Sequence, residues 1–187
     1  MGILEIVLVA IGLAMDAFAV AICKGLAIGK LKIRHYITIG VWFGGFQALM
    51  PLLGYLLGST FSDYAQKFDN WVAFILLAII GANMIREAFG DEEEECETSL
   101  TFLSMFMLAV ATSIDAMAVG VTFAFYEINI ILAVLLIGGI TFTISVLGVK
   151  IGNLFGTRYK KKSEIAGGCI LIILALKFLI EGLTSVF

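Results

Sequence analysis

Two similar stretches of the sequence place an aspartate among apolar residues: LAMDAFAVAICKGLA at 13–27 and TSIDAMAVGVTFAF at 112–125. Both contain the pattern Asp-Ala-x-Ala-Val, which begins at Asp16 in the first stretch and at Asp115 in the second. A carboxylate in apolar surroundings is unfavourable unless it is protonated or has a binding partner. The repetition of this unfavourable residue in one setting indicates a chain built from two related halves.

The composition identifies the solvent around the chain. Of the 187 residues, 61% are hydrophobic and 14% are charged, and the mean hydropathy is +1.07. A soluble domain has about half apolar and about a quarter charged residues. We therefore expect an integral membrane protein whose partner is the lipid bilayer, with no basic face for nucleic acid. The cysteines stand singly at 23, 96 and 169, which argues against a CxxC metal site and a disulfide framework.

Six apolar stretches are long enough to cross a bilayer core, which needs about 20 helical residues. They lie near 3–25, 35–58, 71–89, 100–125, 128–151 and 164–186. The predicted fold is an all-α polytopic membrane protein. The first stretch has no positively charged n-region before it, so we expect it to be a retained helix.

Basic residues in the linkers predict the orientation of the spans. They gather around the first linker, at Lys24, Lys30, Lys32 and Arg34, and in the fifth, at Arg158, Lys160, Lys161 and Lys162. The positive-inside rule places these two linkers in the cytoplasm and both termini outside. The acidic run DEEEECE at 91–97 then also lies inside, where we expect a solvated loop.

The similarity between the halves extends beyond the aspartates. At one constant spacing, Gly44, Gly45, Gly54 and Gly58 recur as Gly138, Gly139, Gly148 and Gly152, and Glu87 recurs as Glu181. Three spans in each half force the halves to insert with opposite orientations. The sequence therefore predicts two inverted three-helix repeats, 1–90 and 100–187, joined by an acidic cytoplasmic linker at 91–99. Inverted repeats are typical of secondary transporters, whose sites form near the midplane.

Asp16 and Asp115 are the strongest candidates for a functional role. Each lies about midway along its predicted span, where an ionised carboxylate costs about 3 kcal/mol on insertion scales. Such a group usually faces the bundle interior and binds an ion, a proton or a counter-charge. Simple hydrogen bonding to a neighbouring helix is the alternative, but it does not predict the same residue at the matching place in both halves.

The residues around the aspartates are candidate auxiliary ligands. Thr112 lies three residues before Asp115 and Thr122 seven after it, so we expect all three to share one face of span four. Span one offers Asp16 mainly small neighbours on its own face, so further oxygens there would come from the backbone or from other helices.

Two more predicted spans each carry a polar pair with helical spacing. Span three has Asn83 and Glu87, and span six has Lys177 and Glu181. The asparagine and the two glutamates are candidate metal ligands, and Lys177 is a candidate counter-charge when no metal is bound. Alternatively, Glu87 pairs with Arg86 at the membrane surface, and Lys177 with Glu181 at a helix end.

Spans two and five carry Gly-xxx-Gly pairs, which most often mark close packing of helices. At matching places they also hold polar or helix-breaking residues: Gln47 and Pro51 in one, Thr141 and Ser145 in the other. Pro51 frees the backbone carbonyl of Gln47, one turn earlier.

Carboxylate, amide, hydroxyl and backbone oxygens form a hard ligand set. Such a set suits Mn²⁺, Mg²⁺ or Ca²⁺, whereas zinc and copper usually recruit His or Cys. Protons and sodium also remain compatible with it. The cation is then a transported substrate, and no resident cofactor is expected.

The stretches MDAFAVAICKGLAIG (15–29), ATSIDAMAVGVTFAF (111–125) and KKSEIAGG (161–168) resemble the MntP family of manganese efflux pumps. The resemblance extends over essentially the whole chain. It implies a bacterial inner-membrane protein that exports Mn²⁺, with the aspartates matching Asp16 and Asp115 at its centre.

Three functions fit these observations. The first is Mn²⁺ export by alternating access, with exchange for external protons as an energy source. The second is export of another cation or cationic solute, such as Ca²⁺, Mg²⁺ or a lysine-like molecule. The third is an intramembrane aspartyl protease in which two aspartates share a proton. The Tyr-Asp and Gly-x-Gly-Asp settings of such proteases are missing, so we expect a transporter and not an enzyme.

Overall fold

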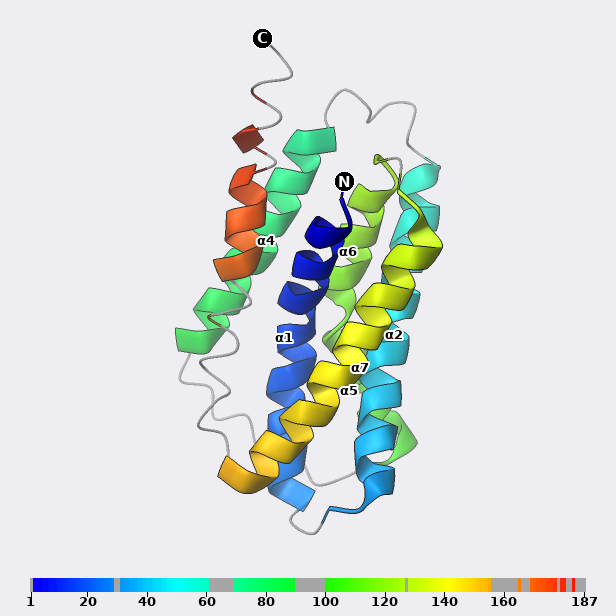
Figure 1. Cartoon of the computed structure of the whole chain (residues 1–187), viewed down its shortest axis with the longest axis vertical. Helices are drawn as coiled ribbons and strands as arrows, with labels where there is room; N and C mark the ends of the chain where they lie inside the picture. Colours follow the sequence, from blue (N-terminus) through cyan, green and yellow to red (C-terminus); the bar gives the residue numbers. More distant parts are fainter. Residues whose placement is uncertain are drawn as a thin grey trace.

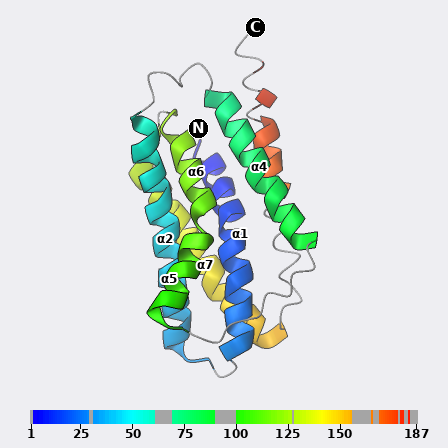
Figure 2. The same cartoon turned by 180° about the vertical axis from the view of Figure 1, so that it is seen from behind.

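The computed structural model describes residues 2–28, 31–60, 69–89, 100–126, 128–155, 165, 169–177, 179–180 and 183. Every element in these ranges is a helix: α1 (Ile3–Ile28), α2 (Ile33–Ser59), α4 (Asp69–Phe89), α5 (Phe102–Ala111), α6 (Ile114–Phe123) and α7 (Ile130–Phe155), and residues 169–177 are also helical. The helices form an elongated bundle, with α2 and α4 on opposite sides (Figures 1 and 2). The predicted all-helical class is therefore confirmed.

Three of these helices, α1, α2 and α7, are long and apolar enough to cross a membrane, and the bent pair α5–α6 makes a fourth if it is one span. Their bounds agree with the predicted spans to within a few residues. Large apolar side chains cover their outer faces; Leu56 and Leu135, for example, are more than half exposed. Such a surface suits a lipid solvent, and the chain is a multi-pass membrane protein.

The predicted fourth span, 100–125, is not one continuous helix. It is broken between Ala111 and Ile114, with a bend of 46°. The hydroxyls of Ser113 and Thr112 turn back to the carbonyl of Ala109, at 2.7 and 3.4 Å. Side chains that bond to the backbone in this way compete with the helical ladder and often bend it.

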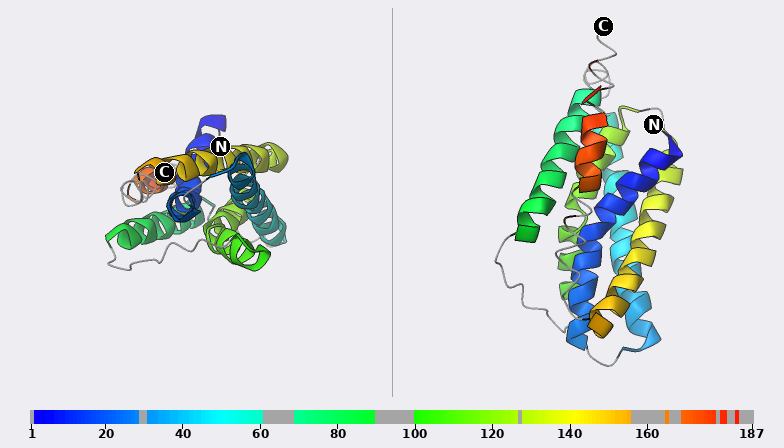
Figure 3. Two further views of the ribbon diagram at one scale, coloured as in Figure 1. Left: turned by 90° about the horizontal axis from the view of Figure 1, so that it is seen from below. Right: turned by 60° about the vertical axis from the view of Figure 1, so that its left-hand side comes forward.

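Two apolar cores fill the bundle. The first core, at the end where α1 begins, comprises Ile6, Val9, Ala10, Leu13, Leu77, Ala116, Val119, Phe123, Ala133, Ile137, Leu171, Leu174 and Ala175. The second core, at the end where α1 finishes and α2 begins, comprises Ala17, Ala21, Ile39, Phe43, Met105, Ala109 and Val149. Figure 3 shows the helices that enclose them. Within these cores α1 packs mainly on α7, and α2 packs on both α6 and α7.

Glycines allow these helices to approach closely. A Cβ at Gly54 would overlap the carbonyl oxygen of Met117 on α6, and a Cβ at Gly152 would overlap that of Ile22 on α1. Gly44 and Gly138 meet where α2 crosses α7: a Cβ at either would lie 2.7 or 2.9 Å from the other's carbonyl oxygen. The predicted role of the glycine pairs in close helix packing is confirmed.

This packing predicts opposite effects of alanine at two kinds of glycine. Gly54→Ala and Gly152→Ala force a side chain against backbone, which should destabilise the fold by about 1–3 kcal/mol. Gly45→Ala and Gly139→Ala are matched controls, because nothing lies within 4 Å of a Cβ at either position. There the better helix propensity of alanine should leave stability unchanged or raise it by up to about 1 kcal/mol. Denaturation of the purified protein in detergent checks this, and equal effects at all four positions would contradict the packing.

Candidate cation site

Asp16 and Asp115 lie at the boundary between the two cores. Asp16 stands on α1 between Leu13 of the first core and Ala17 of the second. Asp115 directly precedes Ala116 of the first core and follows the helix that contributes Ala109 to the second. Asp16 is half-buried, and both carboxylate oxygens of Asp115 are buried. We call the level at which the two cores meet, where each of these residues lies, the polar layer.

Helix α2 adds an amide to this layer. Gln47 is completely buried, and its Nε2 donates a hydrogen bond of 3.1 Å to the carbonyl of Leu13, one turn before Asp16. Along α2 it lies between Phe43 of the second core and Met50, which packs against the first.

Helix α7 adds two hydroxyls. Thr141 and Ser145 are completely buried, between Ile137 of the first core and Val149 of the second. Their Oγ atoms, together with Oε1 of Gln47, have no hydrogen-bond partner among the described residues. A buried oxygen without a partner loses about 1–3 kcal/mol relative to a bonded one, so this layer is suited to receive a ligand.

The break between α5 and α6 places helix ends beside Asp115, which lies in the first turn of α6. The N-terminus of a helix carries partial positive charge, which stabilises an ionised carboxylate there. The last carbonyls of α5 carry partial negative charge, which favours a cation at the break. Broken helices near the midplane are a recurrent feature of transporter binding sites.

Hydrophobic periodicity did not reveal this break, although the adjacent hydroxyls of Thr112 and Ser113 were a signal for it.

The break changes the interpretation of the two predicted threonines. The shared face of Thr112 and Asp115 depended on a helix that continues through 112–113, which the structure does not have, whereas Asp115 and Thr122 lie on the same helix, α6. Thr112 is buried at the break itself. Thr122 is buried at the far end of α6, where its Oγ1 donates a hydrogen bond of 2.6 Å to the carbonyl of Val119.

Three predicted ligands cannot be placed. The side chains of Asn83 and Glu87 on α4, and residue Glu181, lie outside the described residues, as does the acidic run 91–97. Within the described ranges, no three His, Cys, Asp or Glu side chains come together. Among the described residues, the oxygens that remain to coordinate a divalent cation beside Asp16 or Asp115 are neutral ones.

Lys177, the predicted counter-charge, forms an ion pair with Glu5 in the first turn of α1. Glu5 lies about 16 Å along the helix from Asp16, at a rise of about 1.5 Å per residue. This geometry associates Lys177 with the beginning of α1 rather than with the polar layer. The sequence interpretation considered Glu181 as its partner and overlooked Glu5.

Lys24, at the end of the predicted first span, was counted among the basic residues around the first linker, but the structure buries it inside the bundle. The residue is 2% exposed, and its Nζ donates a hydrogen bond of 3.3 Å to Oγ of Ser104 on α5. The continuation of the apolar stretch to Ile28, past Lys24, was the signal that this residue lies inside the helix rather than at its end.

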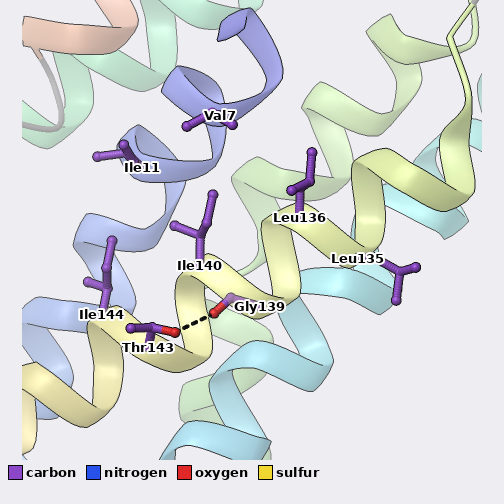
Figure 4. Close-up of a pocket in the computed structure, with 8 residues that line it drawn as sticks. All are labelled: Val7, Ile11, Leu135, Leu136, Gly139, Ile140, Thr143 and Ile144. Atoms are coloured by element: carbon purple, nitrogen blue, oxygen red, sulfur yellow. Dashed lines mark hydrogen bonds between the residues drawn. The ribbon is translucent and has the colours of Figure 1, made fainter. Parts of the chain in front are cut away.

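An apolar groove of about 460 Å³ lies between α1 and α7 (Figure 4). It is lined by Val7, Ile11, Leu135, Leu136, Gly139, Ile140, Thr143 and Ile144. Its only hydroxyl, on Thr143, donates a hydrogen bond of 2.9 Å to the carbonyl of Gly139. The groove contains no charged lining residue and does not include the polar layer, so it is not the cation site.

Comparison with known proteins gives a consistent result. Residues 30–179 match the family described as "Putative manganese efflux pump". A protein named "Putative manganese efflux pump MntP" from Acetivibrio thermocellus is 54% identical over 184 residues, covering 98% of this chain and 93% of the relative. Proteins of the same name from Desulfitobacterium hafniense and Campylobacter jejuni are 54% and 49% identical, covering 98% of this chain and 97% and 98% of the relatives. No solved structure matches the chain.

The family description is that of a transporter and not of an enzyme, and it names manganese as the exported substrate rather than a cofactor. The family match covers most of the chain, and the relatives align over nearly all of it. The resemblance drawn from the two aspartate motifs is confirmed: the chain belongs to the MntP family of manganese efflux pumps.

Proposed function

We propose that this protein exports Mn²⁺ across the bacterial inner membrane by alternating access, with Asp16 and Asp115 as its central ligands. The observation that carries the proposal is the position of both aspartates, at the boundary between two apolar cores of a membrane bundle. Family membership supports manganese as the substrate. The oxygen chemistry of the polar layer is compatible with that metal.

We further propose that the chain has six spans arranged as two inverted repeats, 1–90 and 100–187. The contacts of the glycines support this arrangement. Gly54 meets Met117, and Gly148 meets Phe18; Met117 and Phe18 each lie two residues after the aspartate of their motif. Each half thus packs its glycine helix against the aspartate helix of the other half. The Gly44–Gly138 contact joins two corresponding residues, as expected close to a twofold pseudo-axis.

In alternating access, the two cores act as the barriers on either side of the polar layer. One core must separate while the other stays packed, so that the layer is open to one side at a time. The glycine contacts bring smooth backbone surfaces together in place of interlocking side chains, and such surfaces allow helices to shift against each other.

Proton exchange is the proposed energy source. A carboxylate must be deprotonated to bind a metal, so binding releases protons and protonation favours metal release. Protons that enter from outside would protonate Asp16 and Asp115 and expel Mn²⁺ outward. The return of the protonated carboxylates to the cytoplasmic side would complete the exchange.

The orientation follows from the positive-inside rule. The first and fifth linkers and the acidic linker 91–99 face the cytoplasm, and both termini lie outside. The second core, where α1 ends and α2 begins, then forms the cytoplasmic barrier, and the first core forms the external one.

Loss of either central carboxylate should abolish transport. In proteoliposomes, Asp16→Asn and Asp115→Asn should each reduce Mn²⁺ flux at least about tenfold, because an amide cannot replace the charge that binds the metal. Glu5→Gln is the matched control, since Glu5 lies on the same helix as Asp16 but at its end. A panel of Mn²⁺, Ca²⁺, Mg²⁺ and lysine tests the substrate. Flux at the wild-type rate in both aspartate variants would refute the central role of these residues.

Coupling to protons should be visible in the same vesicles. With a pH dye on one side, Mn²⁺ flux should drive opposing proton movement, and an imposed proton gradient should accelerate flux against a manganese gradient. Asp16→Asn should lose both effects. Manganese flux that is indifferent to the proton gradient would leave the substrate assignment intact and exclude this energy source.

The orientation can be tested by labelling single cysteines, after the three native cysteines are replaced by alanine. Thr60→Cys lies after the end of α2 and should react with a membrane-impermeant maleimide in intact cells, once any outer membrane is permeabilised. Arg34→Cys lies at the start of α2 and should react only after the inner membrane is opened. The reverse pattern would show that the termini face the cytoplasm.

A further inference from the structure

Three neutral oxygens in the polar layer have no assigned role: Oε1 of Gln47, Oγ1 of Thr141 and Oγ of Ser145. We propose that they are ligands of the transported cation, that they complete its coordination beside Asp16 and Asp115, and that they set its selectivity among hard divalent ions. The inference rests on the proposed function and extends it to the side chains of α2 and α7.

The first argument is that these three oxygens accept no hydrogen bond, among the described residues, that would explain their burial. All three residues are completely buried, and the three oxygens have no partner among the described residues. Buried hydroxyls on helices normally bond back to the carbonyl one turn earlier. Elsewhere in this bundle they do so: Ser113 bonds to Ala109, and Thr122 bonds to Val119. Thr141 and Ser145 depart from this pattern, and their lone pairs remain available.

The second argument is that the geometry fixes these oxygens at one place. Gln47 lies one turn after Gly44 on α2, and Thr141 lies one turn after Gly138 on α7, so both flank the crossing of the two helices. The hydrogen bond from Nε2 of Gln47 to the carbonyl of Leu13 holds the amide against α1, one turn from Asp16. Pro51 has no N–H, so the backbone carbonyl of Gln47 also lacks its helical donor.

The third argument is that these oxygens suit the number of ligands that the cation needs. Mn²⁺ and Mg²⁺ prefer about six oxygens, and no third acidic, histidine or cysteine side chain joins a cluster in the described part of the chain. Neutral amide and hydroxyl oxygens can complete the coordination without adding charge. The affinity of oxygen sites falls as the number of charged ligands falls, and a transporter must release its ion as well as bind it.

Repeat symmetry gives the same grouping independently. Gln47 and Thr141 occupy corresponding positions in the two halves, at the spacing that relates Gly44 to Gly138. Asp16 and Asp115 correspond through their shared Asp-Ala-x-Ala-Val motif, at a slightly larger spacing. An amide or hydroxyl and a carboxylate from each half would thus approach the cation from both sides of the crossing.

The test combines equilibrium Mn²⁺ binding to the purified protein with flux in proteoliposomes. Gln47→Leu, Thr141→Val and Ser145→Ala should each weaken Mn²⁺ binding about tenfold and alter the preference among Mn²⁺, Mg²⁺ and Ca²⁺. Thr141→Ser keeps the hydroxyl and should restore most of the lost affinity. Thr143→Val is the matched control, because Thr143 lies two residues away in the outer groove and is hydrogen-bonded to its own helix.

Gln47→Glu keeps the proposal testable even if the other variants fail to fold, because it should increase binding instead of reducing it. It keeps the shape of the side chain and adds a negative charge, so it should tighten Mn²⁺ binding about tenfold at neutral pH and make binding more dependent on pH. A residue with a purely structural role, or one that binds only a buried water, would give no tighter binding. That result, or wild-type affinity and selectivity in Gln47→Leu and Thr141→Val, would overturn the inference.

The aspartate variants distinguish a failure of the proposed function from a failure of the role proposed for the neutral oxygens. If Asp16→Asn and Asp115→Asn bind and transport Mn²⁺ like the wild type, the proposed function itself is wrong. If they lose binding while the variants of Gln47 and Thr141 keep wild-type affinity and selectivity, only the role of the neutral oxygens is wrong.

Discussion

The structure depends on one constraint: carboxylates in an apolar bundle must be placed where other polar groups can meet them. Asp16 and Asp115 satisfy it by lying between two separate cores, so that neither core has to contain a charge. An uninterrupted core along the whole bundle would expel such groups or force them to stay protonated. The division of the interior into two cores is therefore as important as the aspartates themselves, and in the proposed mechanism each core would be the barrier on one side of the layer.

Close approach of the helices determines how narrow this layer is. Where α2 crosses α7 the backbones meet at Gly44 and Gly138, so the side chains one turn away, Gln47 and Thr141, are confined next to the crossing. Larger residues at the glycines would separate the helices, and with them the amide and hydroxyl oxygens proposed to share a cation. In the proposed site the glycine contacts would thus act on function through geometry.

The sequence predicted the features that depend on local composition. The helical class, the bounds of α1, α2, α7 and the α5–α6 pair, and the glycine contacts follow from hydrophobicity and from repetition between the halves. It did not predict the break at Thr112, because hydropathy does not detect hydroxyls that bond back to Ala109. The contacts of Lys24 and Lys177 were not predicted for a related reason. A charge near the end of an apolar stretch suggests a linker or a pair within one helix, whereas Lys24 and Lys177 contact Ser104 and Glu5 on other helices.

Those two lysines also bear on how a cation would be held at the centre. Along α1, Lys24 lies beyond the second core and the Lys177–Glu5 pair lies at the opposite end, with Asp16 between them. In the proposed transport cycle, a divalent cation that leaves the layer toward either end would approach a lysine whose side chain already has a partner on another helix, Ser104 for Lys24 and Glu5 for Lys177. The lysines together with these partners, rather than the lysines alone, would determine the electrostatic barrier to release in each direction.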